Sequence, residues 1–313
     1  MSRSIFSCAV GVVTNAVTRA RVKAKRRVVI EGDCSARWSI IAGAFRWLGM
    51  PGPFAGQSTF GHRSTESPMS LDLHGTEELT KAAVAHYWTT LEAQAARQQS
   101  RPAADRGARA AVTGGKQMDG FCRLIHELLL NNGLQDGHIH LGTKLELPGY
   151  FRPTKNWDML VVHEGTLLAA MEFKSQRGPS FGNNFNNRAE EAIGTGHDLA
   201  TAVREGALGK NHRRPWAGWV MLLEDCGASN SPVSVSESHF PVFPEFRGAS
   251  YATRYELLLR KLVAEKLYDA SALLLATAIG GPRGDYREPA HDLTMRKFLA
   301  GLGGHVAGYL AGR

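Results

Sequence analysis

The segment from residue 156 to residue 175, NWDMLVVHEGTLLAAMEFKS, constrains the fold more than any other part of the chain. It reads as two apolar strands around the turn HEG, which suits a three-residue hairpin loop with Gly165 in the left-handed position. The apolar composition of both strands predicts a buried hairpin. Asp158, Glu172 and Lys174 interrupt these strands, and charged groups near a core need partners.

Periodicity in the rest of the chain predicts alternating helices and strands. Helices are expected over residues 77–99, where apolar residues recur at helical spacing, and over residues 118–130, 188–205, 251–268 and 294–310. Further strands are expected at 138–147, 216–223 and 272–277. Asn187 is expected to cap the third helix, with Glu190 three residues further on. This order predicts an α/β fold with a mixed central β-sheet flanked by helices.

The composition is that of a soluble globular protein, with 43% hydrophobic and 21% charged residues. No apolar run approaches the roughly 20 residues that a membrane helix needs. The four cysteines are far apart and form no CxxC pair. The sequence therefore predicts neither a disulfide framework nor a zinc site, and a reducing cytoplasm is the expected location.

Residues 1–68 differ from the rest of the chain because they hold ten Lys or Arg against three acidic residues. Most of the net charge of +8 therefore lies there, and it is a weak argument for nucleic-acid binding by the folded part. We expect a poorly structured basic leader, with a nucleic-acid-binding arm as the alternative. Residues 69–313 are expected to form one functional domain that starts at Met69, a prediction that loss of activity in a chain starting there would contradict.

The three charges of the hairpin are expected on one face. Glu172 and Lys174 emerge on the same side because strand side chains alternate with period two. If Asp158 lies opposite Ala170, it shares this face, whereas a one-residue slip would separate it from the other two. The simpler interpretation is an edge hairpin whose charges face water and pair with one another.

The functional interpretation of this face is a divalent-metal site. The carboxylates of Asp158 and Glu172, with the Phe173 backbone carbonyl and water, offer the hard oxygen ligands that Mg²⁺ prefers. Lys174 beside the cation could orient or deprotonate a water and stabilise negative charge on phosphorus. Such a site would hydrolyse phosphodiesters.

Asp158 followed by Glu172-Phe173-Lys174 resembles the D…(D/E)xK motif of the PD-(D/E)xK nuclease superfamily. The surrounding stretches AVTGGKQMDGF, GYFRPTKNWDMLVV, MEFKSQRGPSFGNNFNNRAEEAIGTG and PWAGWVMLLED are similar to the XhoI family of type II restriction endonucleases. The similarity runs from about Met69 to the C-terminal end. Trp157 stands where the superfamily usually has Pro, which casts little doubt on Asp158.

The resemblance implies that Asp158 and Glu172 ligate the metal and that Lys174 is the catalytic lysine. Glu127 is a further candidate, because the superfamily core often begins with a helix that bears an acidic residue near the site. A surface charge is the equally plain interpretation of Glu127. Gln176 falls on the Glu172 face and is expected to help position water or the scissile phosphate.

The resemblance also implies the reaction. The expected activity is that of a type II restriction endonuclease that hydrolyses double-stranded DNA with Mg²⁺-activated water. The implied target is the palindrome CTCGAG, cut to leave 5′ overhangs. A palindrome is most simply read by a two-fold symmetric homodimer. A DNA methyltransferase that protects the host is the implied companion enzyme.

Contacts with DNA are expected from the Asn-rich stretch after the catalytic strand and from two basic segments. Asn can bond bidentately to adenine and Arg to guanine in the major groove, whereas basic residues near Gly-rich loops can hold phosphates. The plain alternatives are a turn-rich loop and solvated surface charges. The candidate residues are Asn183, Asn184, Asn186, Arg188, Arg106, Arg109, Lys116, Lys210, Arg213 and Arg214.

Two rival functions remain open from the sequence. One is a repair or recombination nuclease that is directed by DNA structure, and the other is a DNA-binding module without catalytic activity. The intact Asp158, Glu172 and Lys174 set argues against the second. His138 and His140 are interpreted as structural, and TGGK lacks the spacing of a nucleotide-binding P-loop.

Overall fold

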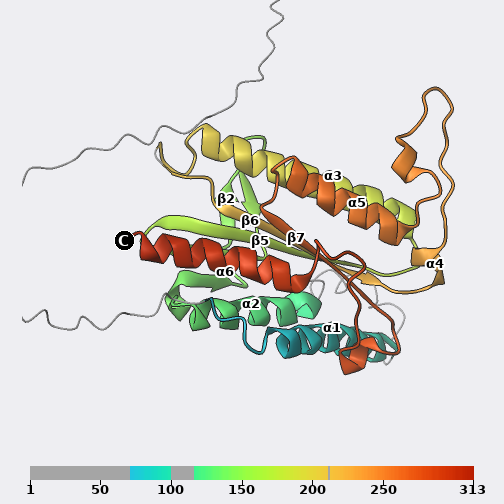
Figure 1. Ribbon diagram of the computed structural model, residues 1–313, viewed down its shortest axis with the longest axis horizontal. Coiled ribbons are helices and arrows are strands. Elements are labelled where there is room, and N and C mark those ends of the chain that lie inside the picture. Colours follow the sequence, from blue (N-terminus) through green and yellow to red (C-terminus); the bar gives the residue numbers. More distant parts are fainter. Residues whose placement is uncertain (1–70, 100–115, 211) are drawn as a thin grey trace, which may run out of the picture. The chain divides into compact units, whose positions relative to one another are not determined.

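The computed structural model of the protein describes residues 71–99, 116–210 and 212–313 (Figure 1). The predicted basic leader, Arg106 and Arg109 lie outside the described residues. Within the described part, no helix is long and apolar enough to cross a membrane.

A mixed five-stranded sheet forms the centre of the fold, in the order β1-β4-β5-β6-β7. β4 pairs antiparallel with β1 and β5, whereas β5, β6 and β7 are parallel to one another. The predicted mixed α/β sheet is thereby confirmed. The strands are β1 (Ile139–Leu141), β4 (Met159–His163), β5 (Thr166–Gln176), β6 (Trp216–Glu224) and β7 (Ala270–Ala276).

Helices cover both faces of this sheet (Figure 1). α3 (Phe181–Arg204) and α5 (Tyr251–Ala264) lie on one face. α6 (Met295–Ala311) and α2 (Asp119–Asn131) lie on the other, with α1 (Thr76–Gln99) packed against α2. The short helices are α4 (Gly227–Asn230) and the 3₁₀ turns Lys116–Met118, Asp136–His138, Pro244–Phe246 and Gly281–Arg283.

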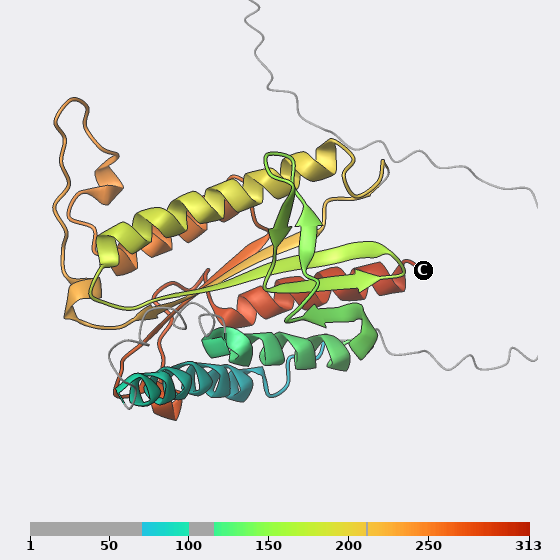
Figure 2. The same ribbon diagram turned by 180° about the vertical axis from the view of Figure 1, so that it is seen from behind.

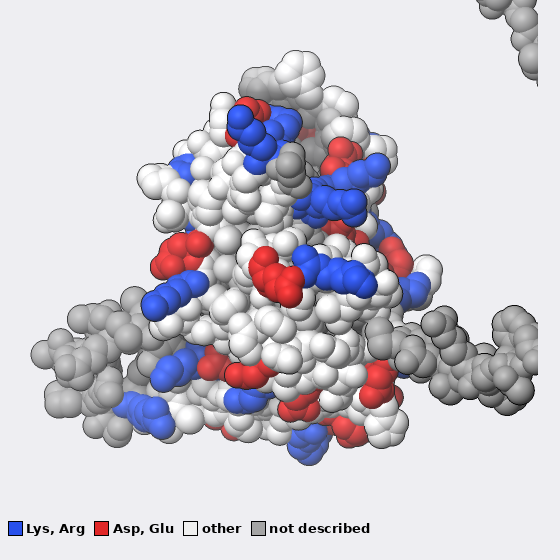
Figure 3. Space-filling model, turned by 90° about the vertical axis from the view of Figure 1, so that its left-hand side faces the viewer, with Lys and Arg blue, Asp and Glu red and all other residues white. Residues whose placement is uncertain are grey.

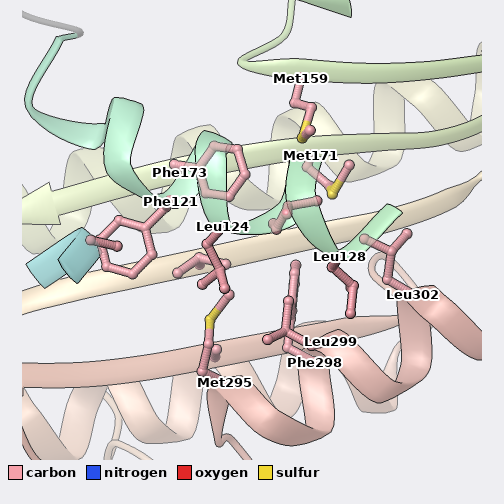
Figure 4. Packing of buried hydrophobic residues seen from close by; sticks show 14 of the residues in the cluster. Phe121, Leu124, Leu128, Met159, Met171, Phe173, Met295, Phe298, Leu299 and Leu302 are labelled. Atoms are coloured by element: carbon pink, nitrogen blue, oxygen red, sulfur yellow. The ribbon is translucent and has the colours of Figure 1, made fainter. Parts of the chain in front are cut away.

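Each face of the sheet has its own hydrophobic core, and β5 contributes to both. Met171 and Phe173 pack with Met159 against side chains of α2 and α6, as Figure 4 shows. Burying a side chain such as Phe173 stabilises the fold by roughly 1.5–3 kcal/mol. Since β5 alternates its faces, Glu172 and Lys174 project to the opposite side, towards α3 and α5.

The predicted strand at 138–147 is wrong as one element. It divides into β1 and β2 (Glu146–Pro148), which belong to different sheets. Gly142 and Lys144 between them have positive φ, which an extended strand does not allow. β2 pairs with β3 (Thr154–Asn156), and Figure 2 shows this green hairpin rising from the sheet towards α3.

The predicted start of the third helix is also wrong. α3 begins at Phe181, so Asn187 lies inside the helix and cannot cap it with Glu190. The Phe181 ring is buried and stacks on Tyr251 of α5, which fixes this first turn against the core. The predicted helix at 251–268 ends earlier, at Ala264, because Lys266 has positive φ.

Candidate active site

The register of the β4–β5 hairpin differs from the predicted one. His163 pairs with Thr166, so the turn has two residues, Glu164 and Gly165, and both have positive φ. A bulge between Val161 and Val162 then shifts the pairing. Met159 consequently lies opposite Met171, with the Asp158 N–H donating to the Met171 carbonyl at 3.2 Å.

Asp158 therefore continues the register opposite Glu172, and the predicted pairing with Ala170 is wrong: Ala170 lies opposite Leu160. The shift preserves the face because two residues of turn plus one bulge restore the even pairing sum. Asp158, Glu172 and Lys174 share one side of the hairpin, as the charge spacing predicts. Asp158 Oδ2 also accepts a hydrogen bond from the Phe173 N–H at 2.8 Å, which fixes the carboxylate beside β5.

Lys174 holds the carboxylates of this face together. Its Nζ lies 3.3 Å from Asp158 Oδ2, 3.3 Å from Glu191 Oε1 and in direct contact with Glu172 Oε2. The Lys174 side chain is 13% exposed and that of Glu172 is fully buried. The edge-hairpin alternative, with its charges in water, does not fit this burial.

Two contributors to the cluster were not predicted. Lys155 of β3 places its Nζ 2.6 Å from Glu172 Oε1, and Glu191 of α3 contacts Lys174 and Arg188. Lys155 is 17 residues from its partner Glu172 in the sequence, and Glu191 is 17 residues from its partner Lys174. Local spacing therefore does not predict either contact. The sequence does offer one indication for Glu191. It lies at helical spacing from Thr195, Asp198 and Ala202, which are buried on α3, so it lies on the side of the helix that faces the sheet.

The electrostatics of the cluster follow from burial and partners. Burial raises the pKa of Glu172, and Lys174 and Lys155 offset this in part. Burial alone would lower the pKa of Lys174, but Glu172, Asp158 and Glu191 outweigh it and raise that pKa. Burial opposes the ionised form of Glu191, yet Lys174 and Arg188 hold its pKa below the ordinary value.

The pKa values of Glu172 and Lys174 are both raised, but for different physical reasons. Lys174 has three carboxylates around it, whereas Glu172 loses all of its water. Aromatic rings complete the surroundings, with Lys155 Nζ at 5.5 Å from the centre of the Trp157 ring and Lys174 Nζ at 5.8 Å from that of Trp219.

The carboxylates of Asp158 and Glu172 suit a hard cation because both already contact one ammonium group. In the described part of the chain, no three His, Cys, Asp or Glu side chains are grouped so that they could hold a metal by themselves. A cation here would need main-chain oxygen and water as further ligands, which is usual for Mg²⁺. The donor set therefore fits a magnesium-like ion.

The two further catalytic candidates occupy different surroundings. Gln176 is buried, donates through Nε2 to the Phe181 carbonyl at 3.0 Å and accepts a hydrogen bond from the Tyr255 hydroxyl. Its amide thus joins β5 to α3 and α5. Glu127 is exposed on α2, and none of the contacts that join Asp158, Glu172 and Lys174 involves it.

The Asn-rich stretch is helical and forms the first two turns of α3. Asn183 and Asn186 are exposed, Asn184 is half-buried, and Arg188 is tied to Glu191 by an ion pair of 2.5 Å. Glu191, one helical turn after Arg188, also contacts Lys174. Arg188 is therefore connected to the Lys174 cluster through Glu191. The exposed amides are free to meet a ligand that approaches α3.

The described residues of the predicted basic segments differ in exposure and in partners. Lys116, Lys210 and Arg213 are exposed, whereas Arg214 pairs with Asp269 at 3.1 Å and donates to the Leu267 carbonyl. Figure 3 views the side where α6 ends and shows Lys and Arg interspersed with Asp and Glu. Among the described residues that this view shows, basic and acidic side chains lie next to one another.

Comparison with known proteins adds to this geometry. The model of the restriction endonuclease XhoI family matches residues 97–288, which include every side chain of the cluster. The chain belongs to the XhoI family of restriction endonucleases. The predicted family is thereby confirmed, and no solved structure matches the chain.

Three curated relatives are type II restriction enzymes. BstVI of Geobacillus stearothermophilus is 54% identical over 65% of this chain and 92% of its own length. XhoI of Xanthomonas vasicola is 47% identical over 71% of this chain and 90% of its own length. AbrI of Azospirillum brasilense is 49% identical over 55% of this chain and 77% of its own length.

Proposed function

We propose that this member of the XhoI family is a type II restriction endonuclease that hydrolyses double-stranded DNA with Mg²⁺. The family match and the three named relatives support the activity. The observation that carries the site is the gathering of Asp158, Glu172 and Lys174 on one buried face of the β4–β5 hairpin.

Asp158, Glu172 and the Phe173 carbonyl would hold the cation. When bound, Mg²⁺ supplies charge neutralisation at the phosphate and a more acidic water. Hydrolysis joins a water oxygen to phosphorus and breaks the bond to the 3′ oxygen, which leaves with a proton as the 3′-hydroxyl. Lys174 faces the same carboxylates as an ammonium group and stabilises negative charge on the phosphate.

Target recognition is proposed to lie on the exposed start of α3. Asn183, Asn184 and Asn186 can form bidentate bonds to adenine, and Arg188 can do so to guanine. Lys116, Lys210, Arg213 and Arg214, with Arg109 outside the described residues, are the proposed phosphate contacts. The resemblance to the XhoI family supports a CTCGAG target and 5′ overhangs.

A palindromic target further supports a two-fold symmetric homodimer, in which each protomer cuts one strand. A cognate DNA methyltransferase would protect the host's own sites. Glu127 and Gln176 stay weaker candidates for catalysis, since Gln176 already has two structural partners.

Digestion of plasmid DNA, followed by sequencing of the fragment ends, tests the proposal directly. We expect cuts at CTCGAG that require Mg²⁺, leave 5′ overhangs and disappear in a Glu172→Gln variant. Glu265→Gln is the matched control, because Glu265 is exposed at the end of α5. Equal cutting of scrambled duplexes would favour a structure-directed nuclease, and binding without cutting would favour a non-catalytic module.

A further inference from the structure

Lys155 is, with Lys174, one of two largely buried lysines in the described structure that contact Glu172. Its strand neighbours Thr154 and Asn156 are exposed, but the Lys155 side chain is only 16% exposed. It points inward because strand side chains alternate, and its Nζ reaches Glu172 Oε1 at 2.6 Å. A charged side chain, whose burial costs free energy unless it is paired, thus reaches from a separate hairpin into the candidate active site.

The hairpin that carries Lys155 is fastened to α3. Asp198 Oδ1 accepts hydrogen bonds from the backbone N–H groups of Tyr150 and Phe151 at 2.8 and 2.9 Å, and Asp198 Oδ2 pairs with Arg152 at 2.8 Å. Gly149 lets the turn approach, because a Cβ there would lie 2.6 Å from the Arg152 carbonyl oxygen. The position of Lys155 is therefore determined by tertiary contacts.

The two lysines divide the two oxygens of Glu172 between them. Lys174 occupies Oε2 and also contacts Asp158 and Glu191, whereas Lys155 occupies Oε1 and has no second carboxylate among the described residues. A cation that binds Glu172 needs an oxygen that an ammonium group now holds. The other contacts of Lys155 are with the neutral Asn156 carbonyl and the Trp157 ring, so Lys155 gives up fewer charged partners than Lys174 by moving.

We propose that Lys155 is a second active-site lysine, which neutralises Glu172 before metal binding and moves to a DNA phosphate once a divalent cation takes Glu172. The inference rests on the proposed function, because it assumes that Glu172 ligates the metal. It assigns the β2–β3 hairpin a direct part in the chemistry. A merely structural Lys155 would contribute packing and would not compete with a cation.

Metal affinity without DNA separates these roles. Mn²⁺ binding to the full-length protein, followed by electron paramagnetic resonance, should be about tenfold tighter in Lys155→Met, because a competing charge at contact distance is removed. At saturating Mg²⁺, the same variant should cut plasmid at least about tenfold more slowly, because a phosphate contact is lost. Lys297→Met is the matched control on exposed α6 surface.

Lys155→Arg keeps the charge and guards against a folding defect in Lys155→Met. It should bind Mn²⁺ as the unchanged protein does. The proposal is overturned if Lys155→Met binds Mn²⁺ no more tightly than Lys297→Met, or if its cutting is unchanged at saturating metal. A Glu172→Gln variant that retains Mn²⁺ affinity would instead overturn the proposed metal site, and the inference with it.

Discussion

The two faces of β5 are both largely buried, but they are chemically opposite. One presents Met171 and Phe173 to the core beneath α2 and α6, where only packing matters. The other presents Glu172, Lys174 and Gln176 beneath α3 and α5, where each of these three side chains has an ion-pair or hydrogen-bond partner. Unpaired buried charges are costly, so the polar face depends on partners from other elements. Lys155 pairs with Glu172, Glu191 pairs with Lys174, and Tyr255 donates a hydrogen bond to Gln176. The apolar face contributes to stability, and the polar face is the one that we propose for the chemistry.

Removing a charge from the polar face should have the largest effect on cutting. Lys174→Met should slow cutting by about 10³-fold, because the positive group next to the reacting phosphate is lost. Single-turnover cleavage at saturating Mg²⁺ measures the effect, with Lys297→Met as the control. Near-normal cutting by the Lys174 variant would remove this face from the chemistry.

The apolar face should respond in stability. Phe173→Ala is expected to lower the free energy of unfolding by about 4 kcal/mol, since it leaves a cavity among α2 and α6 side chains. Urea denaturation measures it. Phe240→Ala, at a side chain that is 84% exposed, should change stability by less than about 0.5 kcal/mol. Similar costs at both positions would contradict the assigned packing.

Asp198, which holds the β2–β3 hairpin on α3, should make stability depend on pH. Burial opposes its ionised form, but the N–H groups of Phe151 and Tyr150 and the Arg152 guanidinium hold its pKa below the ordinary value. A lowered pKa gives stability that is present above the unfolded-state pKa near 4 and lost as pH falls through the folded value. Asp198→Asn should therefore cost about 2 kcal/mol at pH 7 and progressively less in acid. Urea denaturation across pH 2–7 tests this, and a constant difference would be the contrary result.

Glu191 offers a finer test of how Lys174 is held. Glu191→Gln should slow cutting about tenfold, because one of three carboxylates that position the ammonium group becomes neutral. The neighbouring Glu190→Gln, on the exposed side of α3, should cut normally. Equal effects of the two changes on the cleavage rate would mean that Lys174 does not depend on Glu191.

The smallest expected effect concerns DNA backbone contacts away from both faces. Arg213→Gln should weaken binding to all duplexes alike and lower the slope of log affinity against log salt by about one. Arg283→Gln provides a control at an exposed arginine far along the chain, paired with Asp285. Filter binding across salt concentrations, with Ca²⁺ in place of Mg²⁺, measures the slope. An unchanged slope would exclude Arg213 as a phosphate contact.

Sequence spacing accounts for part of this site. Period-two alternation is sufficient to bring Glu172 and Lys174 together, and an even register adds Asp158. Sequence spacing does not predict the position of Lys155, because that position depends on the packing of the β2–β3 hairpin against α3. The contacts of this hairpin with Thr195 and Asp198 join residues that are 43 or more positions apart in the sequence. The prediction that Asn187 caps the third helix is wrong because the packing of Phe181 against Tyr251 starts the helix earlier than local propensity indicates.

The bulge at Val161 and Val162 determines which changes in the hairpin turn the enzyme can tolerate. Adding or deleting one residue at Glu164–Gly165 would invert the parity of β4 relative to β5 and send Asp158 towards the methionines of the opposite layer. Adding two residues would preserve parity. Only changes of an even number of residues in this turn therefore keep Asp158 on the face of Glu172, given the bulge at Val161 and Val162.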